Sequence, residues 1–313
     1  MDDIIDAARV AEESGYFDSV WVGDNFIAKP RVEAMVTLAA IAAHTSKVKL
    51  GTICMSTFAM RHPVQLAIQW ASLDVLAKGR TILGACIGGT GYPKADKEWE
   101  VMGVSSNERV GRMVEGINLL RRFWTEEQVT HHGRYYDFDD VEVLPKPIQK
   151  PVPIWIALNP RAHVDESVVD RGLRRVAKYG EGWQTDGTPV ETFRNRFERI
   201  REYAAEEGRD PSALKSALHL MVNINDDNEA AWKDATTFLE KYYGVGAHSI
   251  DVMDTWIAGG PPKKVAQKIQ SYIDAGCTTP VLRFAAADLK GQLRRCIDEV
   301  LPLLHGVEQR LPV

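Results

Sequence analysis

The chain of 313 residues lacks the long apolar runs and the basic surplus that mark several large classes of protein. No window holds eighteen uncharged apolar residues, so we expect no membrane-spanning segment. Residues 2–14 carry acidic and basic side chains, which excludes the apolar core of a signal peptide. The net charge of −5 offers no basic surface, so neither nucleic acid nor a membrane is an expected partner.

Cysteine is scarce, and its spacing is uninformative about metals. The four cysteines, Cys54, Cys86, Cys277 and Cys296, lie far apart and match no metal-binding or redox motif. Four cysteines in a chain of this length are typical of buried thiols in a reducing compartment. We therefore expect a cytoplasmic protein that binds no metal.

A complete dinucleotide-binding fingerprint is also absent, although residues 79–91 read GRTILGACIGGTG. Gly89 and Gly91 supply G-x-G, but Lys94 stands where the third glycine belongs. Pro93 and a charged stretch follow, so we do not expect a helix to begin at the glycines. We interpret the stretch as a strand and its loop. Either the bare backbone amides approach a phosphate or a ring, or the glycines only allow a sharp turn.

What the sequence does contain is a persistent alternation of short β-rich segments with longer helical ones. Seven strands are predicted, each followed by a helix, and one further helix begins the chain. The predicted strands are residues 17–23, 47–55, 81–88, 153–158, 182–187, 214–224 and 278–284. This alternation fits either a doubly wound sheet or an eight-fold barrel. No linker of proline, glycine and serine divides the chain, so we predict one domain over residues 1–313.

Two stretches depart from the alternation. Residues 129–153 predict a hairpin around Gly133 and then a proline-rich crossing. A loop-rich insertion is expected after residue 244, up to Gly260. His62 precedes a proline and is expected to begin a helix rather than to act as a base.

Five segments in order resemble the bacterial luciferase-like superfamily of flavin-type oxidoreductases. They are AARVAEESGYFDSVWVGDN, VKLGT, RHPVQLAIQWASLDVLAKGRTILG, ERVGRMVEGINLLRRFWT and PVPIWIA. That superfamily includes FMN-dependent monooxygenases and enzymes that use the deazaflavin coenzyme F420. The resemblance implies an α/β fold, a (β/α)8 TIM barrel with insertions. Members normally begin with an apolar strand, which is missing from the N-terminus here, so either the start is misassigned or the barrel is completed in another way.

The resemblance also implies where the site lies. Asp24 and Asn25 are the implied catalytic pair, at the position where the family usually has Asp followed by His. The implied cofactor-binding residues are Thr52, Ile53, Cys54, Ser56, Gly88, Gly89, Leu158, Asn159, Pro160, Trp183 and Thr185. By the same alignment, a cis peptide that backs the cofactor ring would join Ile53 to Cys54. Trp183 is equally compatible with a place in the core.

Three departures from the family pattern bear on activity. Asn25 replaces the usual histidine, so a titrating imidazole is lost. Gly89 stands where some deazaflavin sugar-phosphate dehydrogenases have a proton-donating glutamate. Asn159 and Pro160 replace glycines, which leaves fewer free amides for a phosphate.

The resemblance implies a monooxygenase that uses reduced FMN and oxygen on a small organic substrate, with a separate flavin reductase as a partner. One alternative is an F420-dependent dehydrogenase or reductase that transfers a hydride. A second is a barrel that binds ligands without catalysis; a metal-dependent hydrolase is disfavoured, because only Asp24 and Asp186 lie near predicted strand ends. The family also implies a homodimer. For a catalytic Asp24, we expect Asp24→Ala to cost activity with little loss of fold.

Overall fold

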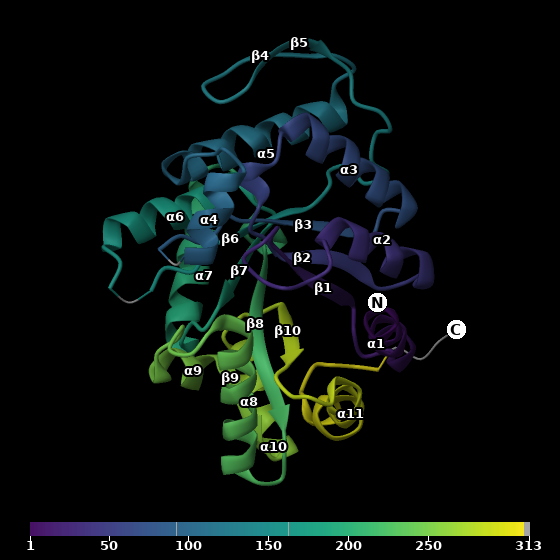
Figure 1. Ribbon diagram of the computed structural model, residues 1–313, viewed down its shortest axis with the longest axis vertical. Coiled ribbons are helices and arrows are strands. Elements are labelled where there is room, and N and C mark those ends of the chain that lie inside the picture. The colour runs from purple at the N-terminus through teal and green to yellow at the C-terminus, as the bar shows by residue number, and fades with distance from the viewer. Residues whose placement is uncertain (92, 162, 310–313) are drawn as a thin grey trace. The chain divides into compact units, whose positions relative to one another are not determined.

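The computed structural model describes residues 1–91, 93–161 and 163–309 (Figure 1). Its residues fall into two compact units. Unit 1 contains Met1–Ala8 and Asp18–Ala157, and unit 2 contains Arg9–Phe17 and the chain from Leu158 onward. Helix α1 (Asp2–Ser14) begins the chain and contributes to both units.

Unit 1 is built on four parallel strands in the order β1-β2-β3-β6. These strands are β1 (Ser19–Asp24), β2 (Lys49–Met55), β3 (Thr81–Ala85) and β6 (Ile154–Ala157). The helices between them are α2 (Ala34–His44), α3 (Pro63–Leu76), α4 (Pro93–Val101) and α5 (Arg109–Thr125). An antiparallel hairpin of β4 (Val129–His132) and β5 (Asp137–Val141) follows α5, as the alternation around Gly133 predicts.

The core of unit 1 forms where large aromatic side chains meet small ones. The Trp21 ring lies over Gly51 on the neighbouring strand, where a side chain of any size would collide with it. Trp155 packs against Trp21 with ring centroids 5.3 Å apart. His62 caps the start of α3, because its Nδ1 accepts a hydrogen bond from the Val64 N–H at 3.3 Å. This confirms the position predicted for His62.

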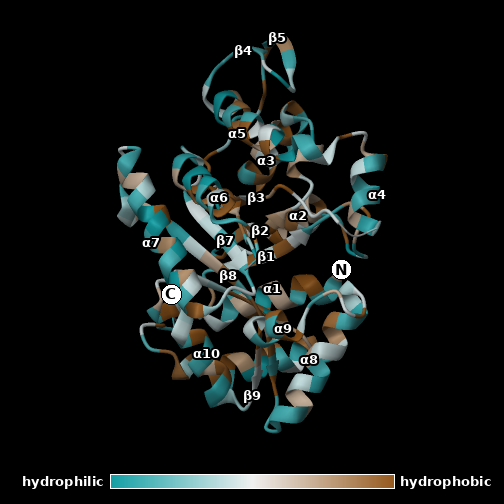
Figure 2. Cartoon of the chain, turned by 90° about the vertical axis from the view of Figure 1, so that its left-hand side faces the viewer, coloured by the Kyte–Doolittle hydropathy of each residue, from teal (hydrophilic) through white to brown (hydrophobic). Residues whose placement is uncertain are grey.

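Unit 2 contains three further parallel strands of the alternation, β7 (Gly182–Asp186), β8 (Lys215–Ile224) and β10 (Thr279–Phe284). A short strand, β9 (Ile257–Gly260), pairs with the far end of β8. The helices are α6 (Glu166–Tyr179), α7 (Val190–Glu206), α8 (Asn228–Tyr243), α9 (Ile250–Trp256), α10 (Pro262–Asp274) and α11 (Leu289–Arg295). Apolar and polar residues share the surfaces of α8 and α10 (Figure 2), as expected for helices that cover strands on one side.

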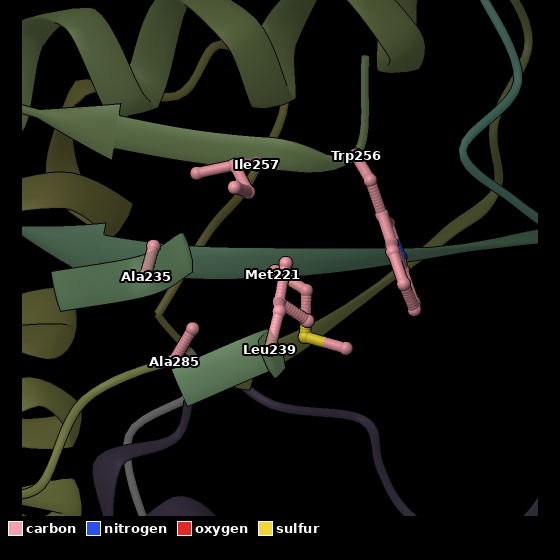
Figure 3. Packing of buried hydrophobic residues seen from close by; sticks show 6 residues of the cluster. All are labelled: Met221, Ala235, Leu239, Trp256, Ile257 and Ala285. Atoms are coloured by element: carbon pink, nitrogen blue, oxygen red, sulfur yellow. The ribbon is translucent and has the colours of Figure 1, made fainter. Parts of the chain in front are cut away.

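One buried cluster of unit 2 packs the long strand β8 against its neighbours. Figure 3 shows Met221 of β8 among residues that come from α8, α9, β9 and the end of β10. The cluster consists of Met221, Ala235, Leu239, Trp256, Ile257 and Ala285. The Trp256 indole N–H also donates to the His219 carbonyl at 2.9 Å, so α9 is fixed to β8 by a directional contact as well.

All seven predicted strands are present, and residues 2–14 form the predicted first helix. Three elements were not predicted: α4, α9 and β9. The insertion before Gly260 was expected to be loop-rich, but α9 and β9 occupy its second half. No helix in the described part of the chain is long and apolar enough to span a membrane. Among the same residues, no group of His, Cys, Asp and Glu side chains is placed to hold a metal ion.

Candidate functional site

The implied site residues of unit 1 lie at the ends of three neighbouring parallel strands. Asp24 is the last residue of β1, and its backbone carbonyl accepts a hydrogen bond from Ser56 Oγ, just after β2. The backbone carbonyl of Ser56 in turn approaches Gly88, after β3, so closely that a Cβ there would lie 2.7 Å from it. The structure therefore brings Asp24, Ser56 and Gly88 together, as expected at the carboxyl ends of adjacent strands.

The Asp24 carboxylate is fully engaged by its own protein. Its Oδ2 accepts from the Thr57 backbone N–H at 3.0 Å and from Thr57 Oγ1 at 2.6 Å. Its Oδ1 accepts from Arg61 Nη2 at 3.0 Å. The Asp24 side chain is 0% exposed and that of Arg61 is 8% exposed, so this is a buried ion pair. Arg61 continues the network to Glu33 Oε1 at 2.9 Å.

Asn25 is also buried, but its side chain is only half satisfied. The residue is 5% exposed, and its Nδ2 donates to the Lys29 carbonyl at 3.0 Å. That bond fixes which way the amide points, because only the nitrogen can donate to a carbonyl. Among the described residues, Oδ1 of Asn25 has no hydrogen-bond partner. A buried amide oxygen without a donor is costly unless something else supplies one.

Strand β2 contains the cis peptide that the resemblance implies. The bond between Ile53 and Cys54 is cis. One residue earlier, Thr52 is completely buried, and its Oγ1 accepts from the Gly84 N–H at 2.9 Å. Thr52 thus fastens β2 to β3, and Cys54 is partly exposed beside it.

The glycine loop after β3 is held by its neighbours. Gly88 has φ of +72°, and a Cβ there would lie 2.7 Å from the Ser56 carbonyl oxygen and 2.8 Å from the Trp99 ring. Gly89 has its carbonyl bound by the Trp99 indole N–H at 2.8 Å. The positive φ and the close contacts with Ser56 and Trp99 therefore require a glycine at position 88, whether or not a ligand binds there.

The implied residues of unit 2 form a second group. Leu158 is paired by its backbone N–H with the Gln184 carbonyl at 2.9 Å, and its own carbonyl accepts from the Trp183 indole at 2.9 Å. Pro160 follows two residues later and is partly exposed. Trp183 is 0% exposed and stacks on Phe193 with centroids 4.9 Å apart. The structure thus places Trp183 in the core, the second of its two predicted environments.

Asn159 and Thr185 meet in a polar network at the end of β7. The Asn159 amide donates to Asp186 Oδ1, and its oxygen accepts from Thr188 Oγ1 at 3.2 Å. Thr188 Oγ1 also lies 2.8 Å from Thr185 Oγ1. Enclosure by the protein raises the pKa of the Asp186 carboxyl, while Arg161, 3.4 Å away, acts in the opposite direction.

Sequence reasoning missed the residues that hold the unit 1 group in place: Thr57, Arg61, Glu98 and Trp99. Arg61 precedes the His-Pro pair that begins α3, so its sequence context indicated a helix boundary. Glu98 and Trp99 lie in a charged stretch that shows no strand or helix periodicity. The only local signal was a tryptophan beside a glutamate, and it does not indicate which residues they contact.

Comparison with known proteins shows which family the chain belongs to. Residues 1–279 match the luciferase-like monooxygenase family. An F420-dependent glucose-6-phosphate dehydrogenase of Kineococcus radiotolerans is 30% identical, over 96% of this chain and 93% of its own length. An F420-dependent secondary alcohol dehydrogenase, solved with an F420-acetone adduct, has a TM-score of 0.80 at 21% identity and covers 96% of this chain and 94% of its own.

A monooxygenase from Streptomyces bottropensis, RslO1, has a similar fold, with a TM-score of 0.77 at 22% identity over 96% of this chain and 93% of its own. At such identities the solved structures show the fold alone. The predicted fold class, an α/β chain of the TIM-barrel kind with insertions, is thereby confirmed.

Proposed function

The chain belongs to the luciferase-like monooxygenase family and is an oxidoreductase of the flavin- or F420-dependent kind; from that premise we propose that it is an F420-dependent dehydrogenase or reductase. The substrate class we propose is an alcohol or the corresponding carbonyl compound. The relative from Kineococcus radiotolerans, which this chain matches over almost its whole length, is named for F420-dependent oxidation of a hydroxyl compound. The comparisons thus favour the hydride-transfer alternative over the monooxygenase that the sequence put first.

The observation that carries the proposal is the unpartnered amide oxygen of Asn25. Asn25 directly follows β1, which pairs with the strand that contains the cis peptide, and the residue is 5% exposed. Its amide oxygen can accept a hydrogen bond from an N–H of a deazaflavin ring or from a substrate hydroxyl, so the residues of unit 1 fit such a ligand. When bound, F420 supplies a carbon that gives or takes a hydride.

In this proposal, Asp24 and Asn25 hold other groups in position. Oxidation of an alcohol would transfer a hydride from carbon to the cofactor and release the hydroxyl proton to water. Asn25 can hold the hydroxyl through Oδ1, but an amide cannot take up its proton. The Asp24 carboxylate already accepts from Thr57 and Arg61, so we assign it to fixing the turn after β2. The roles implied for the cofactor-binding residues of both units stay predictions.

A monooxygenase that uses reduced FMN is the second candidate, and two departures from the deazaflavin pattern favour it. Asn25 and Gly89 replace the histidine and the glutamate that the deazaflavin pattern would carry. For that candidate, a separate flavin reductase is the expected partner. A protein that binds neither cofactor would match the non-catalytic alternative.

Titration of the purified protein with oxidised F420 and with reduced FMN, each followed by fluorescence, tests these functions. We expect F420 to bind and to be reduced without oxygen when a suitable alcohol is added, which its absorbance reports. Asn25→Leu keeps the size of the side chain but removes the acceptor. It should weaken F420 binding by about tenfold, the effect of one lost hydrogen bond of about 1.4 kcal/mol. Oxygen consumption with reduced FMN and no response to F420 would overturn the proposal in favour of the monooxygenase.

We also propose that each chain is one domain, that two chains form a homodimer, and that the protein is cytoplasmic. Exposed apolar side chains on α2 and α3 support a second copy as partner: Val36 is 57% exposed, and Ile68, Val75 and Leu76 are 40–48% exposed. The four free cysteines suit a reducing compartment. Light scattering tests the dimer, since a mass near 34.9 kDa would mean a single chain.

A further inference from the structure

Helix α4, which the sequence did not predict, carries two adjacent buried side chains that contact the loops after β1, β2 and β3. Glu98 is 4% exposed and Trp99 is 3% exposed, on a helix with charged residues at most other positions. Neither residue belongs to the implied site. Both contact the loops that carry the implied site residues.

Glu98 binds the loop that follows Asp24 and Asn25. Its Oε1 accepts hydrogen bonds from three successive backbone N–H groups, those of Phe26 at 2.5 Å, Ile27 at 2.7 Å and Ala28 at 3.3 Å. Successive N–H groups that converge on one point are the usual backbone arrangement for binding an anion. Here the anion is a side chain of the same protein, about seventy residues away in sequence.

Trp99 binds the other two loops. Its indole N–H donates to the Gly89 carbonyl at 2.8 Å, in the loop after β3. Its ring packs with Ala59 and Met60, which follow β2, and Phe26 of the first loop packs against the same cluster. One turn of α4 is therefore joined to all three loops at the strand ends.

Glu98 gives the loop after β1 a polar anchor outside the loop, in addition to the packing of Phe26. The Asn25 side chain is fixed by the Lys29 carbonyl, which belongs to the same loop. That hydrogen bond holds the amide relative to the loop, but it cannot hold the loop relative to the strands. The three N–H groups bound by Glu98 lie between Asn25 and Lys29, so this carboxylate fixes both ends of the bond.

We propose that Glu98 is a positioning residue that holds the loop of residues 25–29 so that the Asn25 amide oxygen faces the bound cofactor or substrate. The inference rests on the proposed function, because it requires a ligand at Asn25. Charge-assisted hydrogen bonds from three donors make Glu98 a directional anchor, which apolar packing alone would not be. A supporting group of this kind acts on binding through geometry, without touching the ligand.

The test compares Glu98→Ala with a matched variant, Glu115→Ala. Glu115 of α5 uses one oxygen in the same way, accepting from the backbone N–H groups of Tyr135 at 3.2 Å and Tyr136 at 3.1 Å. It anchors the β4–β5 hairpin and not the strand-end loops. Affinity for oxidised F420 is measured by fluorescence titration, and backbone amide exchange is measured on the cofactor-free protein.

We expect Glu98→Ala to speed amide exchange at residues 26–28 and to weaken F420 binding by roughly tenfold, the lower end of the range seen for groups that orient metal ligands. Glu98→Gln keeps an acceptor oxygen and should restore most of the affinity. Glu115→Ala should speed exchange at residues 135 and 136 and leave F420 affinity unchanged. If Glu98→Ala does not fold, Glu98→Asp carries the test, because it keeps the charge but is one methylene too short.

Faster exchange at residues 26–28 with wild-type F420 affinity would overturn the inference, since Glu98 would then be structural only. Equal losses of affinity in Glu98→Ala and Glu115→Ala would overturn it as well, by indicating a general loss of stability. The wild-type titration comes first and separates the two claims. A wild-type protein that does not bind F420 overturns the proposed function and this inference with it, whereas normal binding that is insensitive to Glu98 overturns the inference alone.

Discussion

Replacing Asp24 by alanine should destabilise the protein, which separates an anchoring role from a catalytic one. The substitution removes the acceptor for Thr57 N–H, Thr57 Oγ1 and Arg61 Nη2. It leaves a guanidinium that is 8% exposed with Glu33 as its remaining carboxylate. Removing one partner of a buried ion pair costs about 3–5 kcal/mol, and here Glu33 compensates the remaining charge of Arg61 only in part.

The corresponding shift in Tm follows from the size of the chain. An unfolding entropy of about 2.1 cal/mol/K per residue gives roughly 0.7 kcal/mol/K for 313 residues. A loss of 3–5 kcal/mol therefore lowers Tm by about 4–8 °C. Differential scanning calorimetry on Asp24→Ala, Arg61→Ala and the double variant measures it. The double variant should lose at least about 1 kcal/mol less than the sum of the single ones, because both act on one network.

The control is Glu126→Ala, which breaks an exposed pair between Arg122 and Glu126, four residues apart on the surface. Such pairs contribute about 0.3–0.5 kcal/mol, so Tm should barely change. The structural argument is refuted if Asp24→Ala lowers Tm no more than Glu126→Ala does. A large loss of activity at unchanged Tm would instead restore the catalytic role that the resemblance implies for Asp24.

Two further substitutions and one chemical probe test other parts of the structure. Gly88→Ala and Gly91→Ala both place alanine at positive φ, which costs about 1–2 kcal/mol. Gly88→Ala should lower Tm clearly more than Gly91→Ala does, because its Cβ would lie 2.7 Å from Ser56 O, whereas, apart from its neighbours in the chain, no described residue lies within 4 Å of a Cβ at Gly91. Equal decreases in Tm would contradict this packing. Burial raises the pKa of Cys277 and of Cys296 to about 12, so both thiols stay protonated and unreactive at pH 8. A thiol reagent should modify Cys54 and Cys86 at most in the native protein, and all four cysteines after unfolding. Rapid labelling of Cys277 in the native protein would contradict its burial between α10 and β10.

The strands could be predicted because their signal is local. Buried parallel strands are typically continuous apolar runs, and several of the seven predicted strands have one. Two of the three missed elements, α4 and β9, lack that signal for identifiable reasons. Helix α4 has charged side chains around Glu98 and Trp99, so its periodicity is hidden. Strand β9 has glycine at two of its four positions and extends only because the end of β8 pairs with it.

The site could be predicted in part, because strand ends fix where side chains gather but not what holds them. The resemblance to the family predicted that Asp24, Ser56 and Gly88 belong to one site and that a cis bond follows Ile53. The structure shows these three residues together and shows the cis bond. It could not indicate Arg61 or Glu98, whose partners lie 37 and about seventy residues away in sequence. A buried carboxylate gives no sign in the sequence of which donors it will meet.

Several residues implied for cofactor binding and catalysis have contacts within the protein that account for their conformation, whereas the contacts of Asn25 do so only in part. Gly88 must be a glycine because the Ser56 carbonyl and Trp99 leave no room for a Cβ, so its conformation is no sign of a ligand. Thr52 and Asp24 are likewise occupied by hydrogen bonds within the protein. Asn25 differs, because its amide is oriented by Lys29 and its buried oxygen still lacks a donor among the described residues. The case for a bound ligand in unit 1 therefore depends on Asn25, one of the residues at which this chain departs from the family pattern.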